Sequence, residues 1–243
     1  MDKRTALIYI DRWANFYLRI LGESDKLELI EKDFYTILRP RDDKWASIFD
    51  VRLEDLSDED LTKTVDEIKA MKKHVWWNQY SDKVTACIFP EGRREPTPND
   101  DEVFAVMTRD ELPDYPSAII DVRRAKTPED FEAFHSVCFD KTLSSNNLFN
   151  LHNKGLLDCY LGCKDSFVVA ATALLKNGQV YSLELASTLS RFRGMGYATA
   201  VCQAALNSAF RESAEVVTIR AGGGPAANEV SKLLGKKLGF EYI

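Results

Sequence analysis

The stretch from Ser187 to Thr199 reads Ser-Thr-Leu-Ser-Arg-Phe-Arg-Gly-Met-Gly-Tyr-Ala-Thr, with glycines at Gly194 and Gly196. An aliphatic and β-branched run, 180–186, precedes the glycines, and a helix-forming run, 198–210, follows them. The sequence therefore predicts a strand, a glycine turn and a helix. Because the first N–H groups of a helix lack partners inside it and lie at the positive end of its dipole, this arrangement suits a phosphate group.

Arg191 and Arg193 add positive charge and hydrogen-bond donors to this turn. Two other phosphate motifs fit the sequence less well. A dinucleotide-binding turn lies tight against the strand end and needs glycine or alanine at its sixth position, where this chain has Thr199. A Walker loop needs Gly-Lys-Ser or Gly-Lys-Thr, which the sequence lacks.

The pattern Arg-x-x-Gly-x-Gly over 191–196 resembles the coenzyme A pyrophosphate loop of the GCN5-related N-acetyltransferases, the GNAT family, in which it follows the fourth strand. A second stretch, 228–240, is similar to the family's Asn-x-x-Ser/Ala helix, which ends in Leu-Gly-Phe. A strand-like run at 215–221 separates the two motifs. The resemblance covers residues 117–243.

The resemblance implies an α/β fold of the α+β type, with a GNAT-like, mixed and mostly antiparallel central sheet flanked by helices. The residue pattern predicts the order β-α-α-β-β-β-α-β-α-β, from a strand at 117–124 to a last strand that begins at Phe240. It also predicts helix starts at Thr127-Pro128 and at Ser144, and a hairpin turn at Asn177-Gly178. Family members usually carry a further strand after this Gly-Phe. Either the chain is cut short at Ile243, or another segment takes the place of that strand.

The length of 243 residues suits one large or two small domains. The proline-bearing run at 112–117 predicts a boundary between an N-terminal α/β domain over 1–115 and an acetyltransferase domain over 116–243. The N-terminal part has no phosphate loop, and its helix followed by Trp76-Trp77 is similar to degenerate N-terminal halves of two-part family members. Its predicted elements are a helix at 4–21, strands at 34–38, 46–51 and 103–107, and a capped helix from 57 or 58 to 73.

The resemblance also implies that acetyl-CoA is the co-substrate and that the end of the fourth strand and the glycine loop bind it. Backbone groups at 185–187 would pair with the pantetheine amides, those at 193–199 would bind the pyrophosphate, and Asn228 would contact the pantetheine arm or the thioester. Leu185 and Ala186 lie nearest to the N–H that polarises the thioester carbonyl in the family. The expected coenzyme-binding residues are Leu185, Ala186, Ser187, Arg191, Arg193, Gly194, Met195, Gly196, Tyr197, Ala198, Thr199 and Asn228.

Glu184 is the candidate catalytic residue. The period of a strand places it with Ser182 and Ala186, opposite the leucines. A carboxylate on that face can take a proton from the attacking amine directly or through water, bind a cationic acceptor, or lie in solvent.

The general acid is open. In many relatives a tyrosine seven residues after the asparagine protonates the thiolate, and this chain has Gly235 there. Three tyrosines are possible substitutes, and the sequence selects none of them: Tyr160, Tyr181 and Tyr242.

Composition narrows the classes of partner. A net charge of −6 and the lack of a long basic run argue against nucleic acid, and no apolar run is long enough to span a bilayer. The N-terminus loses its apolar character too early for a signal peptide, so we expect a cytoplasmic protein. Five cysteines without a Cys-x-x-Cys spacing and 3 scattered histidines predict neither a disulfide framework nor a metal site.

These observations favour an acetyl-CoA-dependent N-acetyltransferase that acts on a primary amine of a small molecule or peptide, either as a monomer or as a homodimer. The alternative is a non-catalytic protein of the same fold that binds acyl-CoA and regulates. Gly235 and the lack of a last strand favour that alternative. The loop alone does not separate acetyl from longer acyl groups.

Overall fold

A computed structural model describes residues 1–42, 45–52, 57–70, 74–77, 103–115, 119–138, 140–221 and 225–242. The chain divides into two compact units, Met1–Asp100 and Asp101–Ile243. Among the described residues, each unit has its own sheet, of four strands in the first and six in the second.

The second unit is an α/β structure with a mixed, mostly antiparallel sheet, as the sequence predicts. The strand order is β5-β10-β9-β8-β7-β6, and only β9 and β10 pair in parallel. The strands are β5 (Val103–Thr108), β6 (Asp121–Arg124), β7 (Leu157–Lys164), β8 (Phe167–Asn177), β9 (Val180–Thr188) and β10 (Val216–Ala221).

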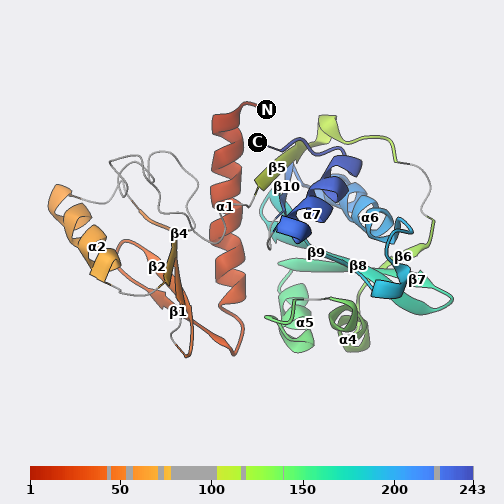
Figure 1. Ribbon diagram of the computed structural model, residues 1–243, viewed down its shortest axis with the longest axis horizontal. Coiled ribbons are helices and arrows are strands. Elements are labelled where there is room, and N and C mark those ends of the chain that lie inside the picture. The colour runs from red at the N-terminus through yellow and green to blue at the C-terminus, as the bar shows by residue number, and fades with distance from the viewer. Residues whose placement is uncertain are drawn as a thin grey trace. The chain divides into compact units, whose positions relative to one another are not determined.

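Helices cover both faces of this sheet. Figure 1 shows α6 and α7 on one face and α4 and α5 on the other. The helices are α4 (Pro128–Val137), α5 (Ser145–Asn153), α6 (Tyr197–Glu212) and α7 (Pro225–Lys237). No described helix has both the length and the apolar character that a membrane span requires.

The ends of these elements follow from local chemistry. The Thr127 side chain caps α4 and accepts a hydrogen bond from the Asp130 N–H, and Pro128 occupies the first turn. Ser144 caps α5 in the same way. Gly178 has a φ of 60°, which suits the tight turn between β8 and β9, and Asn177 pairs with Val180 across that turn. These predicted helix starts and this hairpin are confirmed.

One predicted strand belongs to a different sheet from the one we expected. The run at 103–107 forms β5, but β5 pairs antiparallel with β10 from Val216↔Thr108 to Ala221↔Val103. It is therefore part of the second unit, whose boundary precedes 116. The residues of a strand indicate that the segment adopts an extended conformation, but they do not specify its partner. The partner of β5 lies more than a hundred residues away in the sequence.

The same strand, β5, also meets the segment that follows Gly239. The predicted last strand is reduced to a single bridge between Tyr242 and Ala105. β5 thus lies between β10 on one side and Tyr242 on the other. A segment from before the predicted domain boundary thus occupies the position beside β10.

The strand predicted at 117–124 is observed only as β6, and residues 116–118 lie outside the described ranges. The buried side chains on the α6 face include Leu183, Val217 and Leu206. On the other face the buried side chains of α4 and α5 include Phe134 and Leu148.

The first unit is also built of helices and a sheet, with strand order β1-β2-β3-β4. The first two pairings are antiparallel and the third is parallel. Leu18 of the first helix packs with Leu27, Leu38 and Phe49 of the sheet. Its elements are α1 (Lys3–Leu21), β1 (Leu27–Glu31), β2 (Thr36–Pro40), β3 (Trp45–Phe49), α2 (Asp58–Ala70) and β4 (His74–Trp77). The sequence interpretation missed β1 and β4.

Candidate functional site

The two parallel strands of the second unit separate at their carboxyl ends. β9 and β10 pair from Val216↔Val180 to Ile219↔Leu183 and no further. Beyond that point β10 continues along β5, while β9 continues along β8 as far as Thr188↔Ala170. The edge of β9 that faces away from β8 therefore has no strand partner after Leu183 within the described parts of the chain. A ligand with amide groups can pair there as an added strand would.

A β-bulge lies at the same point. The register of β8 and β9 shifts between Ala171 and Ala173, so that two residues of β9, Leu185 and Ala186, oppose Thr172 alone. Leu185 has a φ of 57°, in the left-handed region that non-glycine residues rarely adopt. The sequence interpretation did not predict the bulge, because nothing in the residues at 184–187 indicates it.

The glycine loop joins the end of β9 to α6, as predicted. Gly194 and Gly196 have φ values of 78° and 79°, which glycine adopts without steric cost, and Gly196 is the N-cap of α6. A Cβ at Gly194 would meet open space, whereas one at Gly196 would lie 3.2 Å from the Ile119 side chain. The space beside Gly194 is thus open to a ligand. At Gly196 the backbone conformation explains why the residue is glycine.

The start of α6 is free to bind an anion. Its first turn holds no acidic residue, and its first helical hydrogen bond joins the Ala200 N–H to the Gly196 carbonyl. Among the described residues, no backbone carbonyl accepts from the N–H groups of 194–199. The Arg193 N–H differs, because it donates to the Ser190 carbonyl. Of the N–H groups at 193–199 that the sequence predicts for an anion, the one at Arg193 is therefore already bonded within the chain.

The two arginines of the loop are held in different ways. The Arg193 Nε donates to the Thr188 carbonyl at 3.3 Å, and the Arg191 guanidinium lies 4.8 Å from the centre of the Phe192 ring. Both side chains belong to residues exposed to solvent. The loop thus carries two positive charges close to free backbone N–H groups, as the sequence predicts.

The end of β9 carries a buried hydroxyl, the Thr188 Oγ1, that has no hydrogen-bond partner among the described residues. A buried hydroxyl without a partner costs about 1–3 kcal/mol. The neighbouring Ser187 differs, because its side chain bonds to the Cys138 thiol: burial raises the pKa of Cys138, and this hydrogen bond lowers it. Since most buried polar groups in proteins are satisfied, the exception at Thr188, beside an open strand edge, is compatible with a ligand there.

Glu184 lies at the separation of the strands. Its side chain is buried, with 7% of the residue exposed, and its carboxylate accepts a hydrogen bond from the Ser182 hydroxyl. Leu183 packs in the core beneath α6, so the alternation of a strand places Glu184 on the face that α4 and α5 cover. The expected grouping of Glu184 with Ser182 is therefore confirmed, and solvent exposure of this carboxylate is excluded.

The helix α7 follows β10 as α6 follows β9, so both helices start at the carboxyl ends of the separating strands. Asn228 lies in the first turns of α7, and its side chain lies outside the described part of the structure. Its predicted contact with the coenzyme stays a prediction.

Of the three tyrosines that the sequence leaves open, Tyr242 is the one whose hydroxyl bonds to α7 among the described contacts. A Cβ at Gly235 would collide with the Tyr242 hydroxyl, which donates to the Ser231 carbonyl at 3.2 Å. Burial raises the pKa of Tyr242 to about 12, so the phenol stays protonated at neutral pH. The glycine therefore accommodates a phenol that comes from the end of the chain. The other two lie elsewhere: Tyr160 bonds to Arg124, and Tyr181 to Ser213.

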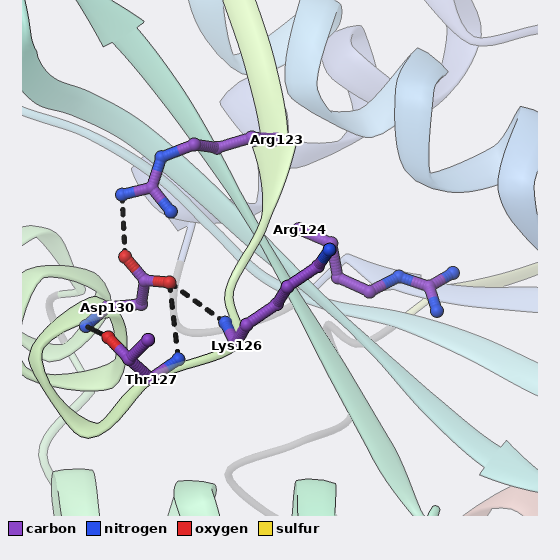
Figure 2. A pocket seen from close by; sticks show the side chains of 5 residues that line it. All are labelled: Arg123, Arg124, Lys126, Thr127 and Asp130. Atoms are coloured by element: carbon purple, nitrogen blue, oxygen red, sulfur yellow. Dashed lines mark hydrogen bonds and ion pairs between the residues drawn. The ribbon is translucent and has the colours of Figure 1, made fainter.

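A separate pocket lies at the start of α4 (Figure 2). The Asp130 carboxylate there accepts hydrogen bonds from the backbone N–H groups of Lys126 and Thr127 and pairs with Arg123 at 2.6 Å. The bond to Arg123 lowers the pKa of Asp130. These polar groups satisfy one another and cap the helix, and none comes from the glycine loop or the separating strands. Elsewhere too, the described residues bring no three potential metal ligands together.

No protein-family model matches the sequence, and no curated protein matches it. Solved structures do match. A GCN5-related N-acetyltransferase from Kribbella flavida has 14% identity and a TM-score of 0.60 over 96% of this chain and 91% of that one. A tandem GNAT protein from the clavulanic acid biosynthesis pathway has 11% identity and a TM-score of 0.62 over 95% and 92%. A GCN5-related N-acetyltransferase from Sphaerobacter thermophilus has 12% identity and a TM-score of 0.57 over 96% and 90%. The chain therefore has the GNAT fold.

Proposed function

We propose that the chain is an acetyl-CoA-dependent N-acetyltransferase that moves an acetyl group to a primary amine of a small molecule or peptide. The observation that carries the proposal is the separation of β9 from β10 beyond Leu183, with a free helix N-terminus beside it. The similar solved structures from Kribbella flavida and Sphaerobacter thermophilus are described as N-acetyltransferases, and this supports the same activity for the present chain.

The residues present fit coenzyme A. Its pantetheine arm carries amides that can pair with the open edge of β9 at 185–187, and its pyrophosphate suits the N–H groups of 194–199. The buried Thr188 hydroxyl has no partner among the described residues, and a bound ligand at this edge would supply one. Asn228 would contact the pantetheine arm or the thioester. The coenzyme supplies an activated acyl group as a thioester.

The chain's own groups would perform two tasks at the thioester. A backbone N–H at the bulge, from Leu185 or Ala186, would donate to the carbonyl oxygen, where negative charge develops. Glu184 would accept the proton that the amine loses, directly or through water, as the C–N bond forms and the C–S bond breaks. The departing thiolate gains one proton. A buried carboxylate also suits a cationic acceptor, because it attracts an ammonium group.

The test is acetyl-CoA binding by calorimetry, followed by thiol release over a panel of amines, amino acids, aminoglycosides and peptides. Binding with release that depends on the acceptor is the expected result. Binding without release on any amine would support the non-catalytic acyl-CoA-binding alternative. No binding would contradict both.

Ala198→Asp provides a variant in which stability and binding change in opposite directions. A carboxylate in the first turn of α6 stabilises the helix by about 0.3–1 kcal/mol, so Tm stays equal or rises. The same charge repels a phosphate, and we expect affinity for acetyl-CoA to fall by at least about tenfold. Ala198→Asn is the matched neutral control and should bind more tightly than the Asp variant. Equal affinity in the folded Asp variant and the wild type would remove the loop from the site.

A further inference from the structure

The bulge on β9 is held by side chains from two directions. The Thr172 hydroxyl donates to the Glu184 carbonyl at 3.0 Å, and Thr172 is fully buried. The Cys138 thiol, at the end of α4, donates to the Leu185 carbonyl at 3.7 Å. Two successive carbonyls of the bulge are therefore bonded to side chains.

The Thr172 hydroxyl replaces a bond that the sheet has lost. Thr172 is the single β8 residue opposite the two bulged residues of β9, where the regular ladder of backbone bonds is interrupted. An unpaired carbonyl buried at that point would cost about 1–3 kcal/mol. The hydroxyl removes this cost without restoring the regular register.

The Cys138 thiol stabilises a backbone conformation that is otherwise unfavourable. Leu185 has a φ of 57°, and for a branched, non-glycine residue this region costs about 1–2 kcal/mol. Burial raises the pKa of Cys138 to about 12, so its sulfur carries a proton to donate at neutral pH. Its acceptor is the carbonyl of the strained residue itself.

These two bonds determine the direction of two N–H groups. A peptide unit is planar and trans, so its N–H points opposite to its carbonyl. Because the Glu184 carbonyl points toward Thr172 on β8, the Leu185 N–H points away from β8, toward the side that β10 has left. Because the Leu185 carbonyl points toward Cys138 on the α4 side, the Ala186 N–H points toward the opposite face.

We propose that Thr172 and Cys138 are positioning residues that hold the bulge and direct the Leu185 N–H into the gap between β9 and β10. This inference rests on the proposed function for its catalytic meaning, since the Leu185 N–H is then the donor to the thioester carbonyl. Of the two N–H groups that the sequence leaves open, the geometry selects Leu185 over Ala186.

The test compares Thr172→Val, which keeps the shape of the side chain but loses the hydroxyl, with Thr172→Ser, which retains it. For the Val variant we expect kcat to fall by roughly ten- to a hundredfold, with affinity for acetyl-CoA nearly unchanged, because the glycine loop is untouched. The Ser variant should recover most of the loss. Cys138→Ala is a second variant, with a smaller expected loss because a thiol is a weak donor.

Amide hydrogen exchange over 180–190 in the ligand-free protein provides a readout that needs no activity. Thr172→Val should speed exchange there, and Thr172→Ser should not. Faster exchange with unchanged kcat would overturn the positioning role, and so would a fall in kcat with unchanged exchange. If Thr172→Val does not fold, Cys138→Ala decides by the same two measurements. If none of the amines tested makes the wild type release thiol, the proposed function fails. Hydrogen exchange then still decides whether Thr172 holds the bulge.

Discussion

At the scale of a single residue, the burial of Glu184 reduces the number of functions that its carboxylate can have. The sequence leaves this carboxylate as a base, a binding group for a cation, or a solvated side chain. The structure buries it at the point where β9 and β10 separate, with the Ser182 hydroxyl as a donor to it. This burial excludes the solvated side chain and leaves the roles of base and of cation-binding group as predictions.

Glu184→Gln should separate these functions from coenzyme binding. The amide keeps the shape of the glutamate side chain, but it cannot take a proton and attracts an ammonium group less strongly than a carboxylate does. We therefore expect kcat/KM for the amine to fall by at least about a hundredfold. Affinity for acetyl-CoA should stay the same, because the glycine loop is separate. Calorimetry and thiol release measure the two effects, with Glu132→Gln, an exposed change on α4, as control. Wild-type turnover in the Gln variant would exclude Glu184 from the mechanism.

At the scale of elements, β5 decides where the second unit begins. It covers the edge of β10, and its buried side chains include Phe104, Ala105 and Met107. Without it, β10 would become an exposed edge strand, which favours association with other chains. A boundary at 116 would therefore remove a structural strand from the unit that contains the candidate site.

Two truncated chains test this boundary. A chain of residues 101–243 retains β5 and should fold and bind acetyl-CoA like the full chain. A chain of residues 116–243 loses the burial of Phe104 and Met107, which contribute about 1.5–3 kcal/mol each, out of a typical total of about 5–15 kcal/mol. We expect it to aggregate or to unfold at a clearly lower Tm. Equal Tm and solubility for the two chains would show that β5 is dispensable. Circular dichroism melts and size-exclusion chromatography provide the measurements.

At the scale of the whole molecule, the two units repeat one connection order. The first runs α1, β1, β2, β3, α2, β4, and the second contains α5, β7, β8, β9, α6, β10, each with two antiparallel pairings and then a parallel one. The idea that the N-terminal half is a degenerate GNAT-like domain stays a prediction. The helix starts differ: α2 begins with Asp58, Glu59 and Asp60, whereas the first turn of α6 has no acid.

This difference predicts a single coenzyme site per chain. The carboxylates at the start of α2 complement its dipole and repel a phosphate, and the Ser57 Oγ accepts from the Asp60 N–H. Calorimetric titration of the full chain with acetyl-CoA should give a stoichiometry of one. Ala198→Asp should then weaken the only binding event and reveal no second one. A stoichiometry of two in the wild type would show that the first unit also binds the coenzyme.

The sequence by itself determined the features that depend on neighbouring residues. Thr127 and Ser144 start their helices, Asn177-Gly178 turns a hairpin, and the glycines at 194 and 196 lead into α6. Capping, turn conformation and periodicity act over a few residues, so they can be inferred without knowing the rest of the fold. The order of elements from β6 to α7, and with it the GNAT fold, followed from them.

Only the tertiary structure decided the features that depend on distant residues. The pairing of β5 with β10, the bulge at Leu185 opposite Thr172, and the contact of Tyr242 with Gly235 each join segments that no local pattern connects. The residues of a strand do not specify which other strand it pairs with. A bulge depends on the register of two strands and on the side chains that bond to the interrupted backbone groups. The candidate loop was therefore predictable, whereas the geometry of the bulge on β9 was not.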